Sequence, residues 1–221
     1  MAKIRRSRAE DQRLASIPTS RVIEDHPANT QARGIAANSG RGKPYTIPVL
    51  QFPSGELVMD SDIIAKRLEA LCPTPSLALD DPILGKVEQA VKEVFLSLLP
   101  VLILPSRDML DGDGRRWFEK DRSQALGMSC DEFAEACGGE TAWTNAESGL
   151  SRLKDVLTSH KTDDGPFIRG KDVTYGDFVI ASFFEWTRRV GDGKVYQRIV
   201  RGDKTFLELQ EACGPWLSKD D

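Results

Sequence analysis

Two hydrophobic patterns divide this chain. Between Thr46 and Leu71, short apolar runs alternate with turn residues, which predicts a strand, a turn, a second strand over 56–59 and a helix. From Leu84 to Leu102 apolar residues recur every three or four positions, which is typical of a helix with one face in a core. The chain is therefore predicted to have a small α/β front part and an all-α back part.

Weaker signals complete this outline. A short strand is predicted over 20–24, a short helix and loop over 29–43, and Pro100 and Pro105 are expected to kink and end the long helix. Residues 111–114 are expected to form a loop. Helices are then predicted over 115–126, 131–136, 144–159 and 175–190, with one or two short ones within 195–217.

The same pattern gives the domain organisation. Residues 1–16 are a polar tail, 17–72 form the α/β part, 73–82 form a linker rich in proline, and 83–221 form the helical part. The linker begins where Cys72-Pro-Thr-Pro75 stops the preceding helix, because proline donates no amide and restricts the residue before it.

Composition narrows the classes of function. The 221 residues carry a net charge of -4, are 40% hydrophobic and 29% charged, and have a mean hydropathy of -0.36, which favours a soluble globular protein and argues against a nucleic-acid partner. No run of 18 apolar residues is present, and the basic start has no apolar segment after it. We therefore expect neither a membrane partner nor a secretory signal. The expected location is the cytoplasm.

Metal and redox chemistry are not expected. The four cysteines show no CxxC spacing and only two histidines accompany them, so neither a zinc site nor a redox dithiol is predicted. Ordinary thiols in a reducing cytosol are the favoured interpretation of Cys72, Cys130, Cys137 and Cys213.

The first candidate for chemistry is Ile47-Pro48, where an apolar strand is expected to end at the proline. An X–Pro bond prefers trans by only about 0.5–1 kcal/mol, so packing can hold it cis. The Ile47 N–H and C=O would then turn outward and pair with a ligand backbone as an added strand does. The alternative is a proline that only marks a strand end.

The second candidate is Asp60-Ser61, where the following helix begins. Free amides and a partial positive charge at a helix start suit a ligand carboxylate, and the Asp60 carboxylate suits an ammonium group beside it. The alternative is a plain helix cap, which stabilises by about 0.5–2 kcal/mol. Taken together around a strand–turn–strand, the two pairs predict a site for a peptide-like ligand.

A third motif, Thr174-Tyr-Gly-Asp177, predicts a capping box with Asp in place of the more usual Glu. It precedes the most apolar helix of the chain. We therefore expect Thr174 and Asp177 to orient that helix and not to contact a substrate.

These residues together resemble the glutathione S-transferase superfamily. Tyr45-Thr-Ile-Pro-Val-Leu50, Gly55 and Asp60-Ser-Asp-Ile-Ile-Ala65 look like its glutathione-binding half, and residues 165–178 look like its capping box and hydrophobic staple. The stretches 117–127 and 17–27 are similar to the fungal FuA transferases related to bacterial β-etherases, and 17–27 matches that family's second strand.

The resemblance implies an α+β protein with a thioredoxin-like N-terminal domain, here partial, and an all-α C-terminal domain. It also implies glutathione as cosubstrate, an apolar small-molecule substrate and a homodimer. By match, Ile47 and Pro48 would hold the cysteinyl backbone of glutathione, and Asp60 and Ser61 its γ-glutamyl end.

The chain departs from the family at its N-terminus. The family's first strand and the loop that carries its thiol-activating Ser, Tyr or Cys have no counterpart before Ile17, so no catalytic residue is assigned, and Ser7 is not singled out. A rebuilt N-terminal region, a partner chain at the sheet edge or a truncated sequence would each account for this. The expected function is glutathione transfer to an electrophilic compound, by conjugation, thiolytic cleavage, or isomerisation or elimination in a secondary-metabolite pathway. The alternative is a non-catalytic ligand carrier or interaction module.

Overall fold

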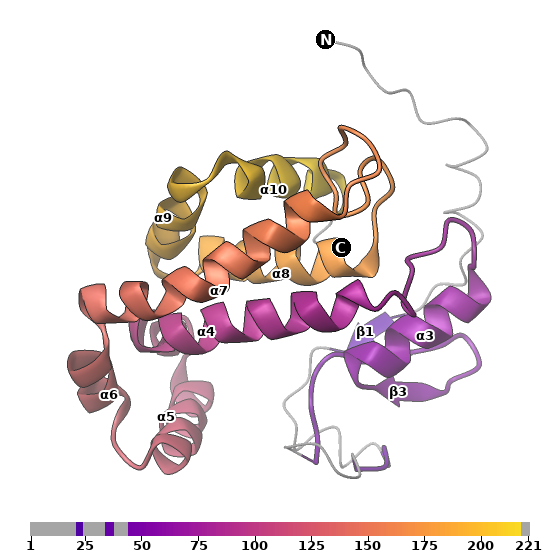
Figure 1. The fold of residues 1–221 in the computed structure, drawn as a ribbon. Helices are drawn as coiled ribbons and strands as arrows, with labels where there is room; N and C mark the ends of the chain where they lie inside the picture. The colour runs from indigo at the N-terminus through magenta and orange to yellow at the C-terminus, as the bar shows by residue number, and fades with distance from the viewer. Residues whose placement is uncertain (1–20, 24–33, 38–43, 218–221) are drawn as a thin grey trace. The chain divides into compact units, whose positions relative to one another are not determined.

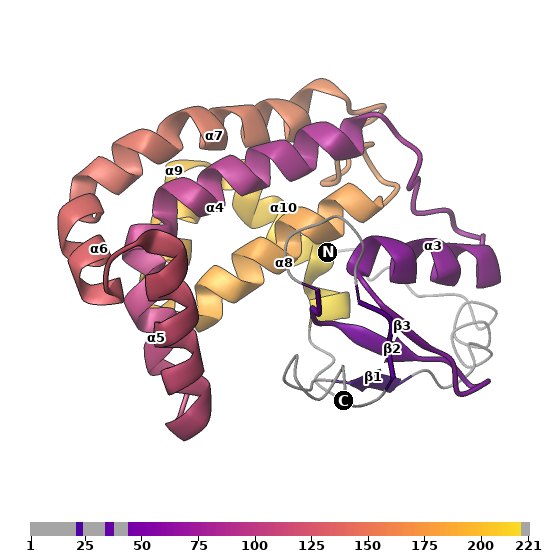
Figure 2. The same ribbon diagram turned by 90° about the horizontal axis from the view of Figure 1, so that it is seen from below.

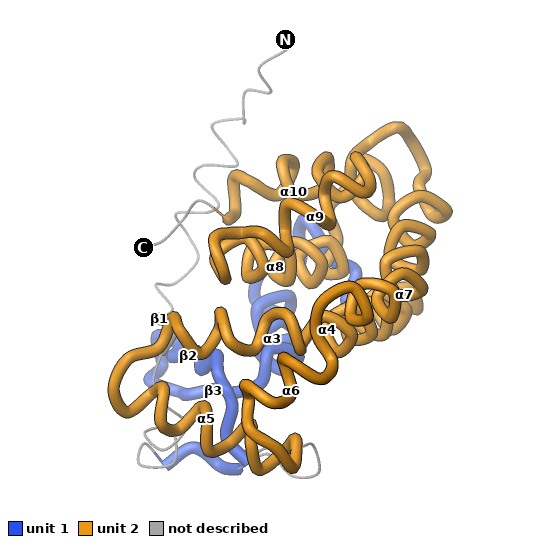
Figure 3. The backbone as a smooth tube through the Cα atoms, turned by 90° about the vertical axis from the view of Figure 1, so that its left-hand side faces the viewer, with its two compact units in different colours: residues 1–79 blue, residues 80–221 orange. Residues whose placement is uncertain are grey.

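The computed structural model describes residues 21–23, 34–37 and 44–217. Contacts within the chain divide it into two compact units, Met1–Leu79 and Asp80–Asp221 (Figure 3). Each unit has its own hydrophobic core. The division falls between Leu79 and Asp80, inside the segment whose composition predicts a linker.

The described part of unit 1 holds one antiparallel sheet. Its strands are β1 (Arg21–Ile23), β2 (Val49–Gln51) and β3 (Leu57–Met59), in that order in the sheet (Figure 2). Val49 lies opposite Met59 in the register of β2 against β3. The turn between β2 and β3 closes when the Phe52 N–H donates to the Glu56 carbonyl at 2.8 Å. Gly55 takes a φ of 87° there, which glycine adopts without strain.

Helix α3 (Ser61–Leu71) completes the described part of unit 1. Ile64 is buried with Leu50, Phe52 and Val58, and Leu68 packs partly against them. The resulting core is small. It fixes β2, β3 and the start of α3 in one arrangement, and the candidate ligand residues lie in that arrangement.

Side chains of each unit hold the linker at its two ends. The Glu69 carboxylate of α3 accepts hydrogen bonds from the Ser76 hydroxyl at 2.6 Å and from the Leu77 N–H at 3.0 Å. In unit 2 the Asp81 carboxylate accepts from the Ile83 N–H at 2.9 Å, at the start of the next helix, and from the Arg169 guanidinium Nε at 2.9 Å.

Unit 2 is all helical in its described residues (Figure 1). Its core lies where α4 (Ile83–Asp108), α7 (Gly139–Ser159), α8 (Tyr175–Arg189) and α10 (Lys204–Leu217) meet. The remaining elements are α5 (Gly112–Leu126), α6 (Cys130–Cys137), the short 3-10 turn η1 (Gly191–Gly193) and α9 (Lys194–Gly202). The largest fully buried side chains of this core include Leu98, Leu102, Ile103, Leu153, Leu157, Ile168, Ile180, Phe184 and Leu209.

Two sequence-based predictions in this unit are wrong. Helix α4 continues through Pro100 and Pro105 to Asp108, because burial of Leu98, Leu102 and Ile103 outweighs the backbone hydrogen bonds that the prolines remove. A loop is expected over 111–114, but helix α5 already begins at Gly112. Of these four residues only Asp111, the helix cap, has an extended backbone.

Helices α4 and α7 approach each other closely at Gly149. A Cβ atom on Gly149 would lie 2.9 Å from Val94 Cγ2 and 3.1 Å from the Val94 backbone nitrogen. Ala142 and Ala146, on earlier turns of α7, are fully buried. Small residues on this face of α7 therefore set the distance between the two helices.

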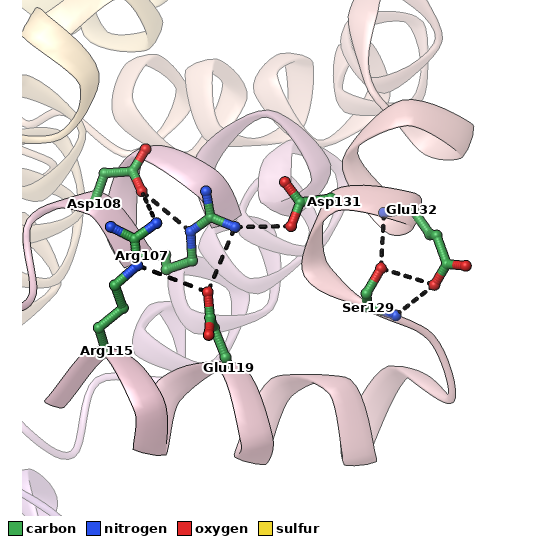
Figure 4. A network of polar contacts seen from close by, with 7 residues as sticks. All are labelled: Arg107, Asp108, Arg115, Glu119, Ser129, Asp131 and Glu132. Atoms are coloured by element: carbon green, nitrogen blue, oxygen red, sulfur yellow. Dashed lines mark hydrogen bonds and ion pairs between the residues drawn. The ribbon is translucent and has the colours of Figure 1, made fainter. Parts of the chain in front are cut away.

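Polar contacts hold α5, a helix with no buried residue (Figure 4). The Arg107 guanidinium, at the end of α4, lies 3.6 Å from the Glu119 carboxylate of α5 and donates to Asp131 of α6 at 2.8 Å. Arg115 of α5 pairs with Asp108 at 3.1 Å. On α6, Ser129 and Glu132 form a capping box in which the Ser129 N–H donates to the Glu132 carboxylate at 2.8 Å.

Candidate functional site

The sheet register brings the two candidate pairs of unit 1 together. Because Val49 lies opposite Met59, the residues just before β2 and just after β3 lie at the same end of the hairpin. A hydrogen bond from the Thr46 N–H to the Met59 sulfur, at 3.1 Å, spans this end. Ile47-Pro48 and Asp60-Ser61 are therefore neighbours in space, although the turn separates them in the sequence.

The Ile47 peptide is open to a ligand. The Ile47–Pro48 bond is cis, and the Ile47 residue is 58% exposed. Within residues 44–217 no hydrogen bond is made by the Ile47 N–H or C=O. Both groups are therefore available to an extended chain laid beside them, in the manner of strand addition.

Asp60 has a backbone that non-glycine residues rarely adopt. Its φ is 81° and its ψ is 119°, a conformation that costs on the order of 1–3 kcal/mol and persists only where the surrounding structure enforces it. Asp60 caps α3, since its carboxylate Oδ1 accepts the Asp62 N–H at 3.0 Å and its carbonyl accepts the Ile64 N–H at 2.9 Å. The cap therefore fixes the direction of the Asp60 carboxylate.

Ser61 is the first residue of α3 and is exposed. Within the ranges that the structure describes, its hydroxyl has no hydrogen-bond partner. The first amides of a helix have no partner inside the helix and carry a partial positive charge. The Ser61 hydroxyl and these amides form a seat suited to a carboxylate, with the Asp60 carboxylate suited to an ammonium group beside it.

Thr174 and Asp177 lie in unit 2 and are buried. The Asp177 carboxylate accepts the Thr174 N–H at 2.7 Å, the Thr174 hydroxyl at 2.8 Å and the Ile168 N–H at 2.8 Å. Burial raises the pKa of Asp177, while the hydrogen bonds from Ile168 and Thr174 oppose that rise. Because the carboxylate is fully enclosed and its bonds go to the protein, the pair orients α8 and the loop before it.

Sequence reasoning missed the contact between Thr46 and Met59. No sequence signal marks a methionine as the hydrogen-bond partner of an amide thirteen residues away, so only the register reveals it. The position of Ser7 lies outside the described residues, and no thiol-activating group is assigned. No group of three or more His, Cys, Asp or Glu in the described part of the chain is arranged to hold a metal.

The sheet shows which strand lies beside β2. β1 pairs directly with β2, with Val22 opposite Leu50, so no strand lies between them in the described sheet. No helix in the described ranges is long and apolar enough to cross a membrane.

Comparisons with known proteins found a matching family model and a curated relative. The family model described as glutathione S-transferase, C-terminal domain, matches residues 86–216. A curated relative, glutathione S-transferase-like protein ustS of Aspergillus flavus, is 25% identical over 195 residues, which cover 80% of this chain and 69% of that protein.

Solved structures share the fold. Glutathione transferase GSTFuA3 from Phanerochaete chrysosporium has a TM-score of 0.74 and 25% identity, over 88% of this chain and 80% of that one. GSTFuA2 from the same organism has a TM-score of 0.74 and 26% identity, and the match covers 88% of this chain and 81% of that one. The glutathione complex of CsGST63524 from Ceriporiopsis subvermispora shows the same fold, with a TM-score of 0.74. Its identity is 22%, and the match covers 88% of this chain and 81% of that one.

These comparisons confirm two predictions from the sequence. The first is the resemblance to fungal FuA-type transferases, and the second is the α+β fold with a partial thioredoxin-like domain and an all-α domain. The family match covers more than half of the chain, from α4 into α10. The chain belongs to the glutathione S-transferase family.

Proposed function

We propose that this protein binds glutathione in unit 1 and brings its thiolate to an electrophilic apolar small molecule. The observation that carries the proposal is the pairing of an unbonded peptide at Ile47 with a strained, capped Asp60 at the same end of the β2–β3 hairpin. Family membership supplies the chemistry of the ligand. The same fold holds glutathione in the Ceriporiopsis protein.

Each end of glutathione has a partner in this arrangement. The Ile47 N–H and C=O pair with the cysteinyl backbone, with Pro48 fixing the chain beside them. The Ser61 hydroxyl and the first amides of α3 bind the γ-glutamyl carboxylate. The Asp60 carboxylate, held in place by Asp62, binds the γ-glutamyl ammonium group.

The Asp60 backbone supports a role in binding over a purely structural one. A helix cap alone does not need a positive φ, and Asp111, Ser129 and Thr174 all cap their helices with extended backbones. A conformation that costs folding free energy is typical of residues whose orientation serves a ligand.

The reaction follows from the nature of the nucleophile. A glutathione thiolate attacks an electrophilic carbon, so conjugation, thiolytic ether cleavage, and isomerisation or elimination in a secondary-metabolite pathway all fit the proposal. The proposal includes a cytoplasmic homodimer, as is usual for the family. It assigns no residue to thiol activation.

Binding to glutathione tests the proposal. Wild-type protein is passed over immobilised glutathione, and calorimetry gives the Kd for wild type, Ser61→Ala and the control Ser151→Ala, which changes an exposed serine of α7. We expect wild type to be retained, the Kd of Ser61→Ala to rise about tenfold and that of Ser151→Ala to stay unchanged. No retention of wild type, with Ser61→Ala indistinguishable from it, contradicts the proposal.

Turnover separates an enzyme from a carrier. The same proteins are assayed with glutathione and a generic aromatic electrophile, and the conjugate is followed by absorbance. Conjugation lost in parallel with binding supports the transferase. Binding without turnover of any electrophile in a panel supports a non-catalytic ligand carrier.

A further inference from the structure

We propose that Met59 is a positioning residue for the ligand peptide of unit 1: its sulfur holds the Thr46 amide and thereby the Ile47 peptide that follows. The inference rests on the proposed function, because the ligand is taken to be glutathione. The inference goes beyond the proposed function because it names a residue, Met59, that contacts no ligand itself and acts through the backbone of Thr46 and Ile47.

The need for such a contact arises from Pro48. The backbone ladder between β2 and β3 reaches Val49 opposite Met59. Proline has no N–H, so the ladder cannot continue from Pro48 towards the N-terminus. The chain before β2 therefore requires another attachment if Ile47 is to keep one position.

Met59 supplies that attachment. Its sulfur accepts the Thr46 N–H at 3.1 Å, one residue before Ile47. A thioether is a weak acceptor, but Met59 is only 5% exposed, so the packing around its side chain restricts the movement of the sulfur. The partly buried Thr46 amide would lose its partner without this acceptor, since no other bond to the Thr46 N–H is found in residues 44–217.

The position of Met59 connects the two ends of the site. It immediately precedes Asp60, whose backbone is strained, and it bonds to the residue that precedes Ile47. The peptide that meets the cysteinyl backbone and the residues that meet the γ-glutamyl end are thus held at a fixed spacing through one side chain. Affinity for glutathione depends on that spacing, because a ligand bound at two points tolerates little error between them.

The test compares four forms of the full chain: wild type, Met59→Leu, Met59→Gln and Met128→Leu. Leucine keeps the buried volume and removes the acceptor, whereas glutamine retains an acceptor at similar reach. Met128→Leu makes the same chemical change at a methionine that is 40% exposed in unit 2. Thermal unfolding of each variant verifies that it is folded.

Two measurements decide the outcome. Hydrogen exchange of the Thr46 amide, followed by NMR without ligand, is expected to be about tenfold faster in Met59→Leu and close to wild type in Met59→Gln. The Kd for glutathione, by calorimetry, is expected to rise about three- to tenfold in Met59→Leu, to recover in part in Met59→Gln and to stay unchanged in Met128→Leu.

Failure of the inference differs from failure of the proposed function. If wild type binds glutathione and Met59→Leu binds it equally well, or if Thr46 exchange is the same in both, Met59 does not position the peptide. If wild type itself does not bind glutathione, the proposed function is wrong and the positioning role falls with it.

Discussion

The carboxylate of Asp177 accepts both the backbone N–H and the hydroxyl of Thr174, at 2.7 and 2.8 Å, and its other oxygen accepts the Ile168 N–H. One buried side chain thus joins the start of α8 to the loop before it. We expect Asp177→Ala to lower the free energy of unfolding by about 2–4 kcal/mol, because three buried donors lose their acceptor.

Urea unfolding followed by tryptophan fluorescence measures this loss. All four tryptophans of the chain lie in unit 2, so the signal reports on that unit. The matched control is Glu132→Ala, which removes the acid of the exposed capping box of α6 and is expected to lower the free energy of unfolding much less than Asp177→Ala. Equal losses for the two variants would show that burial of the Asp177 cap adds nothing.

Glu185 gives the protein a stability that depends on pH. Hydrogen bonds from Arg188 and then Arg189 lower the pKa of Glu185 from 4.5 to about 2. A carboxyl whose pKa is lower in the folded state stabilises above its unfolded pKa, and the contribution is lost as pH falls through the folded pKa. We expect the gap in unfolding free energy between wild type and Glu185→Gln to be about 2 kcal/mol at pH 6, since the two arginines are half exposed and screened by solvent.

Acid titration of both proteins checks this. The gap is expected to narrow between pH 4.5 and about 2 and to close below that range. The contribution of Asp177 to the free energy of unfolding depends on pH in the opposite sense. Because folding raises the pKa of Asp177, that contribution declines as pH rises. Comparison at each pH of wild type with Glu185→Gln cancels the Asp177 effect, and a gap independent of pH would contradict the prediction.

Gly149 should tolerate no side chain. The Cβ of Gly149→Ala would press on Val94, at its side chain and its backbone, so α4 and α7 would have to separate. We expect a net loss of about 1–3 kcal/mol in unfolding free energy despite the better helix propensity of alanine. Gly114→Ala is the control, since its Cβ would lie 3.8 Å from Leu110 Cβ and the change should stabilise by up to about 1 kcal/mol.

Ionic strength should control the attachment of α5. With no buried residue, α5 is held by contacts such as those of Arg107 with Glu119 and of Arg115 with Asp108. We expect amide exchange across residues 112–126 to accelerate about threefold as salt rises, and Arg107→Gln to be fast at all salt concentrations. Arg116→Gln, which removes only a fully local pair with Asp113, is the control. Salt-independent exchange in wild type would exclude electrostatic attachment.

Local signals in the sequence were sufficient for much of the fold. The Thr174–Asp177 cap and the strand–turn–strand from Val49 to Met59 rest on neighbouring residues, and the structure shows both. The long helix was predicted too short, because propensity rules count the cost of Pro100 and Pro105 but not the burial of the residues around them. Non-local packing also decides the role of Gly149, which no sequence pattern marks.

The sequence predicts only part of the candidate site. Ile47, Pro48, Asp60 and Ser61 stand out by type and spacing, but their proximity depends on the register of β2 against β3. The positive φ of Asp60 and the sulfur contact of Met59 arise from three-dimensional packing, which residue type alone does not encode. They nonetheless carry the strongest arguments for a binding role.

The linker is attached by side chains on both sides of a three-residue segment. Glu69 fastens Ser76 and Leu77 to α3, and Asp81 is fastened to Arg169 in the other unit. Only Ala78, Leu79 and Asp80 lie between these anchors, and Ala78 already has a φ of 53°. Proline fixes φ near about −65° and has no N–H, so Ala78→Pro would lose both this backbone and the Ala78 N–H bond to the Ser76 hydroxyl, whereas Ala78→Gly would keep them.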